Sequence, residues 1–182
     1  EEGAVTGSLS QIAQAVGVGK GTIYEYFRSK DELIIFAMEL YVQETEEKVN
    51  SLLDGITNPK ERLSYYSISI VEHIIEDPQT TGILVAIFQL VLANQGNTQQ
   101  SAALEGMFEQ ARRTIIGIIE DGVDKGVFNR QAGDQAEALA INLIAFVDGL
   151  WMHYLASRDF DLKYQVNYYL DNLYAIIEAE RK

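Results

Sequence analysis

A run of small, hydroxyl-bearing and cationic side chains lies between residues 19 and 30. Lysine and hydroxyl groups of this kind can contact the phosphates and base edges of a nucleic acid duplex. Glycines among them leave the backbone bare enough for close approach. Together with two serines of the preceding segment, the candidate nucleic-acid contacts are Ser8, Ser10, Gly19, Lys20, Gly21, Thr22, Tyr24, Tyr26 and Lys30.

Two short helices joined by a tight turn would position these side chains. Gly17 falls where the first helix must stop, and glycine takes a positive φ at little steric cost. Such a unit can place its second helix in a major groove. The expected inward residues are Ile12, Ala13 and Val16 in the first helix and Val18, Ile23 and Phe27 in the second.

Capping signals flank this pair of helices. Ser8 lies three residues before Gln11, which is the spacing of a capping box and predicts a helix start. Ser29 stands in the same relation to Glu32, so a further helix should begin near Lys30. Helix pairs with a glycine turn also occur in proteins that never touch DNA, so this pattern alone leaves both interpretations open.

A fixed spacing of residues is more specific. The run GVGKGTIYEYFRSKDEL resembles the DNA-binding signature of the TetR/AcrR family of one-component transcriptional regulators, a likeness that closely covers about 30 residues. In that family a Tyr-x-x-Phe-x-x-Lys-x-x-Leu core closes the recognition helix and opens the next. The residues that carry the resemblance are Tyr24, Phe27, Lys30 and Leu33, preceded by Ile12, Ala13, Gly17 and Val18.

The resemblance implies a DNA-binding helix-turn-helix domain over residues 1–36 and a larger helical ligand-binding and dimerisation domain over residues 37–182. It also implies a first helix before Glu1, which we expect to be missing from this sequence. Two positions depart from the family pattern. Tyr26 stands where many relatives carry His, and Glu25 stands where a polar or basic residue would suit phosphates better. Glu25 would either accept from a cytosine amino group or point away from DNA, and the second is favoured.

The rest of the chain predicts an all-α fold. Helical periodicity extends over most of it, and no segment alternates with period two for long enough to predict a strand. Asn58 and Pro59 form a helix start, with the asparagine as cap and the proline in the first turn. The expected helices span 31–53, 59–76, 78 to about 94, 98–125, 131–156 and 162–180.

Composition narrows the classes of function. The 182 residues include no cysteine, which excludes disulfides, thiol chemistry and cysteine-based zinc sites and agrees with a cytoplasmic protein. The longest nearly uncharged apolar run, 138–147, is too short to span a bilayer. The net charge of −13 opposes nucleic-acid binding in general, but residues 1–36 contribute only −2 of it.

The last two predicted helices carry more apolar surface than one partner could cover. Hydrophobic residues lie on nearly all sides of the helix over 131–156, so it is either a central core helix or part of an interface. In TetR-like proteins the last two helices pair with those of a second copy, and a homodimer suits a palindromic operator. The expected interface residues are Leu143, Val147, Leu150, Tyr169 and Leu173.

The resemblance also implies an effector pocket among the middle helices. Aromatic residues with a few polar groups are typical of small-molecule sites, although at helical spacing they are more often core. The candidate ligand contacts are Tyr65, Tyr66, His73, Phe88, Gln89, Phe108, Trp151 and Tyr154, with His153 nearby. The histidines lack metal-ligand spacing, so we expect no metal and no cofactor.

These observations favour a ligand-responsive, homodimeric transcriptional regulator, as a repressor rather than an activator, which binds a palindromic operator and is released by a small molecule. No nucleophile–base pattern or phosphate loop indicates an enzyme. The alternative is an all-α dimeric ligand-binding or interaction protein with weakened DNA binding, which Glu25 and the acidic balance support. Substitution of Lys20 and Lys30 would discriminate between the two.

Overall fold

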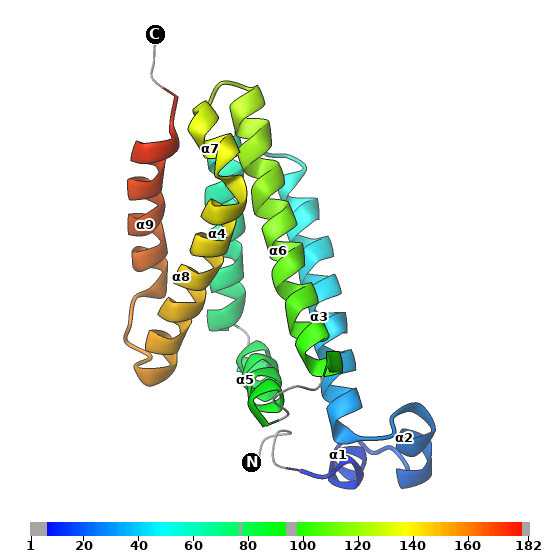
Figure 1. The fold of residues 1–182 in the computed structure, drawn as a ribbon. Coiled ribbons are helices and arrows are strands. Elements are labelled where there is room, and N and C mark those ends of the chain that lie inside the picture. Colours follow the sequence, from blue (N-terminus) through cyan, green and yellow to red (C-terminus); the bar gives the residue numbers. More distant parts are fainter. Residues whose placement is uncertain (1–6, 77, 94–97, 180–182) are drawn as a thin grey trace. The chain divides into compact units, whose positions relative to one another are not determined.

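A computed structural model describes residues 7–76, 78–93 and 98–179, and it confirms the all-α prediction. Within these ranges no strand is present, and an isolated antiparallel bridge pairs Phe128 with Glu178. The helices are α1 Leu9–Ala15, α2 Lys20–Tyr26, α3 Lys30–Leu53, α4 Pro59–Glu76, α5 Pro78–Ala93, α6 Thr98–Asp124, α7 Arg130–Asp134, α8 Ala136–Ala156 and α9 Leu162–Ile177 (Figure 1).

The helix ends follow the capping signals of the sequence. Ser8 accepts a hydrogen bond from the Gln11 N–H, and the Gln11 side chain accepts in return from the Ser8 N–H, which completes the predicted capping box. The Ser29 hydroxyl accepts from the Glu32 N–H at 3.1 Å. Asn58 accepts from the Lys60 N–H at 2.9 Å, so α4 begins at Pro59 as predicted.

One helix predicted from the sequence is divided into two helices in the structure. The segment expected to be continuous over residues 131–156 divides at Gln135 into α7 and α8. Gln135 leaves the helical region, with φ −113° and ψ 12°, while its N–H still bonds back to the carbonyls of Gln131 and Gly133. Asn129 caps the short helix α7 by accepting from the Ala132 N–H at 2.9 Å.

The chain divides into two compact units, residues 1–45 with 77–107, and residues 46–76 with 108–182. This division does not coincide with the predicted boundary at residue 36 between the DNA-binding and ligand-binding domains. That boundary separates functions rather than compact units and stays a prediction. Helix α3 supplies residues to both units, and so does α6. Each unit is described separately below.

The first unit holds two small hydrophobic clusters. Leu9, Ala13 and Ile23 are buried where α1 packs on α2, with Phe27 and Leu33 partly buried against them. A second cluster joins the start of α3 to α5 and α6. Its residues are Ile35, Met38, Ile87 and Leu90, with Ile34, Val42, Ile83, Phe88 and Leu104 packed around them.

The second unit holds the main core, in which α4, α8 and α9 run alongside one another (Figure 1). Tyr174 of α9 is tied to α4, because its hydroxyl lies 2.7 Å from the Ser64 hydroxyl and donates to the Lys60 carbonyl at 3.0 Å. Burial raises the pKa of Tyr174 to about 12, so this phenol stays protonated. The C-terminal end of α9 is thereby fixed on the start of α4.

Candidate nucleic-acid interface and ligand site

Helices α1 and α2 meet through a glycine turn of the predicted geometry. Gly17 has φ +72°, which is the left-handed conformation that favours glycine. The Val18 N–H then donates to the Ala13 carbonyl at 2.9 Å, which closes the turn. Ala13 is 1% exposed, so its small side chain allows the close helix crossing.

Two of the residues expected to face inward do not. Val16 is 65% exposed and Val18 is 39% exposed. Val16 is the C-cap of α1, and Val18 lies in the turn before Gly19 begins α2, so neither side chain continues a helical face. The α1–α2 contact therefore rests on fewer apolar residues than predicted.

The outward side of α2 is open to solvent. Tyr24 is 47% exposed and Tyr26 is 73% exposed. The predicted contact residues Lys20, Gly21 and Thr22 are exposed beside them. These five residues lie on one short helix, so the structure brings together the α2 part of the predicted nucleic-acid surface.

Tyr24 is held from two sides. Its hydroxyl lies 3.5 Å from the Ser10 hydroxyl of α1, and the Lys20 ammonium lies 6.0 Å from its ring centroid. Ser10 is half-buried and thus supports α2 as well as offering a contact of its own. Tyr26 has no contact of this kind among the described residues.

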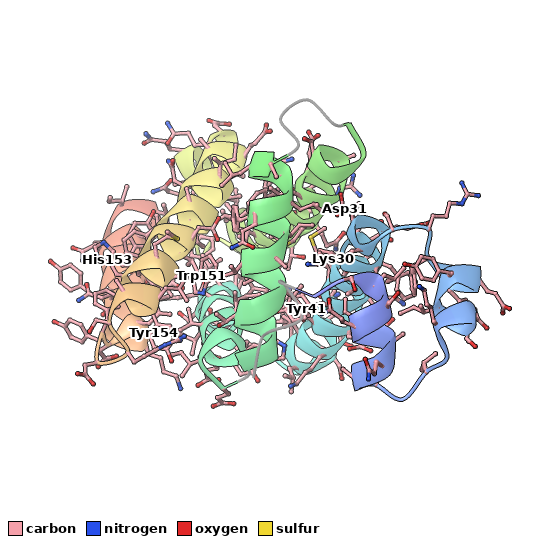
Figure 2. All side chains as sticks on the ribbon, turned by 90° about the horizontal axis from the view of Figure 1, so that it is seen from below. Lys30, Asp31, Tyr41, Trp151, His153 and Tyr154 are labelled. Atoms are coloured by element: carbon pink, nitrogen blue, oxygen red, sulfur yellow. The ribbon has the colours of Figure 1, made fainter. Side chains whose placement is uncertain are left out.

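Other predicted contacts have structural roles. The Ser8 hydroxyl caps α1, Gly19 is the N-cap of α2, and Lys30 is half-buried as the first residue of α3 (Figure 2). Arg28 was not predicted. It is exposed in the α2–α3 turn, and its backbone N–H is fixed by the Glu32 carboxylate at 2.6 Å. Its cationic side chain next to the recognition motif was the signal that could have found it.

The predicted effector residues are distributed over both compact units. Phe88 and Gln89 belong to the first unit, where Phe88 packs on a core cluster and Gln89 is exposed. In the second unit Tyr66, Trp151 and Tyr154 are core residues, at 9%, 4% and 9% exposure. The remaining candidates of that unit are Tyr65, which is exposed, and His73 and Phe108, which are half-buried.

Burial explains the aromatic residues of the second unit. Desolvation, reinforced by the Glu46 carboxylate, raises the pKa of Tyr66 to about 12. Trp151 and Tyr154 point into the unit from α8, whereas His153 points outward (Figure 2). The interpretation of these aromatics as core, left open by the sequence, therefore accounts for Tyr66, Trp151 and Tyr154.

A hollow of about 210 Å³ lies between α6 and α8. Phe108 is the one predicted ligand contact in its lining, which also includes Arg112, Ile141, Ile144, Ala145 and Asp148. Arg112 is engaged by Glu109, at 2.5 Å from the nearer nitrogen. Burial raises the pKa of Asp148 to about 6. Small-molecule sites usually enclose about 300–1,000 Å³, so this open hollow is smaller than a typical effector site.

Of the residues predicted for a dimer interface, Leu143, Val147 and Leu173 lie in the core of this chain, at 2%, 8% and 8% exposure. Tyr169 is half-buried and stacks on Phe146 with ring centroids 4.1 Å apart. Other large apolar residues of α8 and α9 are exposed in this chain. These are Ile141, Met152, Tyr164, Tyr168 and Ile176, with exposures from 45% to 72%.

The length and hydropathy of helix α8 can be compared with those of a membrane-spanning helix. Among the described helices it is the one with the length and composition to cross a bilayer, with a mean hydropathy of 1.4. The uncharged run 138–147 is shorter than the helix that contains it, so its length does not exclude α8. A helix that packs in a soluble protein can have the same composition. Within the described ranges no three histidine, aspartate or glutamate side chains converge on a metal site.

Two family descriptions match the chain. Residues 1–35 match the bacterial regulatory proteins of the tetR family, and residues 59–175 match the C-terminal part of BetI-type transcriptional repressors. The second match covers more than half of the chain. The chain belongs to the TetR family. This family consists of DNA-binding transcriptional regulators rather than enzymes.

Individual TetR-family proteins resemble this chain over most of its length. The regulator HbdR of Aromatoleum sp. (strain CIB) is 32% identical over 156 residues, which cover 81% of this chain and 66% of HbdR. The chain thus spans just under two thirds of that relative.

Two solved structures share the fold at a TM-score of 0.80. A TetR regulator from Haloarcula marismortui is 17% identical, over 95% of this chain and 88% of its own. A transcriptional regulator from Saccharomonospora viridis in complex with choline is 22% identical, over 100% and 91%. These likenesses place the helices of this TetR-family chain in the family fold.

Proposed function

We propose that this chain is a ligand-responsive transcriptional repressor of the TetR family that binds a palindromic DNA operator. The exposed outer side of α2, held by the Gly17 turn inside the matched residues 1–35, is the observation that carries the proposal. A helix presented in this way fits the major groove of a duplex. The match of residues 59–175 to BetI-type repressors supports repression rather than activation. Such a regulator acts in the cytoplasm, where its DNA is.

The test is a mobility-shift assay with the full-length protein and the DNA that flanks its own gene. We expect a shifted complex that weakens steeply with salt, because Lys and Arg contacts to phosphates release counterions. Equal binding to a shuffled fragment of the same composition would contradict operator recognition. Absence of any salt-sensitive complex would contradict DNA binding altogether.

The proposed regulator is a homodimer formed through α8 and α9. Met152, Tyr164, Tyr168 and Ile176 expose apolar surface on these two helices, and large exposed apolar side chains of this kind suit an interface. A second copy would cover this face, which also accounts for the apolar composition of α8 without a membrane. Two-fold symmetry places one recognition helix on each half-site of a palindrome.

The effector is proposed to be a small molecule bound by the helices after α3. One structural relative is in complex with choline and another, SmeT, with triclosan, so choline is the first probe for a chain with a BetI-type match. Helix α3 contributes to both units, which lets a ligand-dependent shift of this helix change the position of α2. Ligand and DNA would then weaken each other by about 1–3 kcal/mol.

A second candidate is a dimeric ligand-binding protein with weakened DNA binding. The net charge of −13 and Glu25 on the recognition helix favour it. The two candidates differ in one measurement, because a folded dimer that binds a small molecule and shifts no DNA fragment at low salt fits only this second function.

A further inference from the structure

Glu25 is an exposed residue of helix α2. Ile23 is buried and Phe27 partly buried, and these residues mark the side of the helix that packs on α1. At 100° per residue Glu25 lies about 200° from Ile23, on the opposite side. Gly21, one turn earlier, shares that side, and a Cβ added there would meet nothing within 4 Å. The carboxylate of Glu25 therefore stands on a bare, solvent-facing stripe.

The Glu25 carboxylate is not engaged by any other described residue. No hydrogen bond or ion pair joins it to another residue in the part of the chain that the structure describes, although Arg28 follows three residues later. The neighbouring groups differ in this respect. Tyr24 is placed against Ser10 at 3.5 Å, and the Glu32 carboxylate accepts from the Arg28 backbone at 2.6 Å. Glu25 is thus free to accept hydrogen bonds from a molecule that approaches α2.

The chemistry of the major groove limits what this carboxylate can accept from. An ionised glutamate accepts hydrogen bonds and donates none. Guanine N7 and O6 and thymine O4 are acceptors and would repel it, and the adenine N6 donor has the N7 acceptor beside it. The cytosine N4 amino group is the donor that a single carboxylate suits best.

We propose that Glu25 is a specificity-determining residue that accepts a hydrogen bond from the N4 amino group of a cytosine in each operator half-site. This inference rests on the proposed DNA-binding function and reverses the sequence-based preference for a side chain pointing away from DNA. The negative charge of Glu25 is repelled by phosphates and by hydrogen-bond acceptors on base edges. Glu25 therefore lowers the affinity for other sequences and increases the preference for the site with cytosine.

The test is selection of binding sites from a random double-stranded DNA pool by the full-length protein. Wild type, Glu25→Ala, Glu25→Gln and the control Glu44→Ala are compared. Glu44 is exposed on α3, so its substitution removes one charge away from α2. Because Glu25 is exposed, its variants are expected to fold, and circular dichroism checks this.

Wild type and Glu44→Ala should enrich cytosine at one position of each half-site. Glu25→Ala should lose that preference by roughly 5- to 100-fold in relative affinity, while the other positions stay unchanged. Glu25→Gln should move the preference at that position to adenine, since an amide pairs with adenine N6 and N7. An unchanged base preference in Glu25→Ala would overturn the inference alone. A wild type that enriches no sequence would overturn the proposed DNA-binding function, and the inference with it.

Discussion

Single residues decide how the proposed DNA-binding surface is displayed. Gly17 provides the left-handed turn that ends α1, and Ala13 provides the close contact between α1 and α2. The side chain of Tyr24 is more restricted than that of the exposed Tyr26, since among the described residues only Tyr24 has a hydroxyl partner on α1. We infer that Tyr24 is pre-positioned for a contact, whereas Tyr26 is ordered by DNA.

The carboxyl group of Asp148 gives a pH-dependent prediction at the same scale. Its burial beside Ile144 raises its pKa from the ordinary 3.8 to about 6. The folded chain therefore holds this proton more tightly than the unfolded chain does. The contribution of Asp148 to stability should fall as the pH rises from about 4 to about 6, by up to about 3 kcal/mol for a shift of this size, and then level off.

Asp148→Asn should remove that pH dependence. The variant should be more stable than wild type by up to about 3 kcal/mol at pH 8 and equal to it below pH 4. Urea unfolding at pH 4, 6 and 8 measures the difference. The same substitution at the exposed Asp134 of α7 is the control and should change stability little at any pH. A constant difference between Asp148→Asn and wild type at all three pH values would contradict the role of burial.

At the scale of helices, capping residues in the sequence predicted where helices begin better than they predicted which helices pack together. The serine and asparagine caps act within four residues, so Ser8, Ser29 and Asn58 could be read from the sequence. The break at Gln135 could not, because no proline or capping side chain marks it. The helix α7 that precedes the break packs closely on the end of α6, since a Cβ added to Gly133 would lie 3.3 Å from the Val123 side chain.

The assignment of faces on α8 shows the same limit. Periodicity showed that α8 is apolar on nearly all sides, and the core side of Ala140, Leu143 and Val147 is real. Periodicity does not say which apolar side meets α9 and which faces outward. Leu143, Val147 and Leu173 are buried within this chain, whereas Leu150 and Tyr169 are half-buried, so the interface residues stay a prediction.

The end of α6 gives a prediction about packing. A Cβ added to Gly122 would fall on the ring of Phe128, which is 2% exposed and cannot move away easily. Gly122→Ala should therefore destabilise the fold by about 1–3 kcal/mol, as overpacking does. Gly117→Ala in the same helix meets nothing within 4 Å and should stabilise it by about 0.5–1 kcal/mol. Chemical unfolding of both variants is the measurement, and equal effects would rule out the steric explanation.

For the whole molecule, the TetR signature could be recognised because Tyr24, Phe27, Lys30 and Leu33 lie close in sequence. The proposed effector contacts could not be recognised in this way, since the candidates are scattered over several helices with no fixed spacing. Aromatic residues predicted as ligand contacts proved to be core where they are buried, as with Tyr66 and Trp151. Composition alone does not separate a cavity wall from a packed interior.

The proposed dimer is tested at the outer face of α8 and α9. Met152→Glu combined with Tyr168→Glu places two charges on surface that a second copy would bury, so the dimer should dissociate at least about 100-fold more readily. Tyr65→Glu, on the exposed side of α4, is the control and should leave the dimer intact. Sedimentation velocity over a concentration series measures the change. A monomeric wild type, or an unaffected double variant, would contradict the proposed interface.

The central claim is that the outer side of α2 and the turn after it bind DNA. The most direct measurement is the salt dependence of affinity for the fragment that the wild type shifts, using full-length protein. Removal of both exposed cations in Lys20→Ala/Arg28→Ala should weaken binding at least about tenfold. It should also lower the slope of log affinity against log salt by about 1 for each phosphate that the variant no longer neutralises. Lys48→Ala, an exposed site later on α3, should match wild type. Equal affinity and slope for all three proteins would contradict the account.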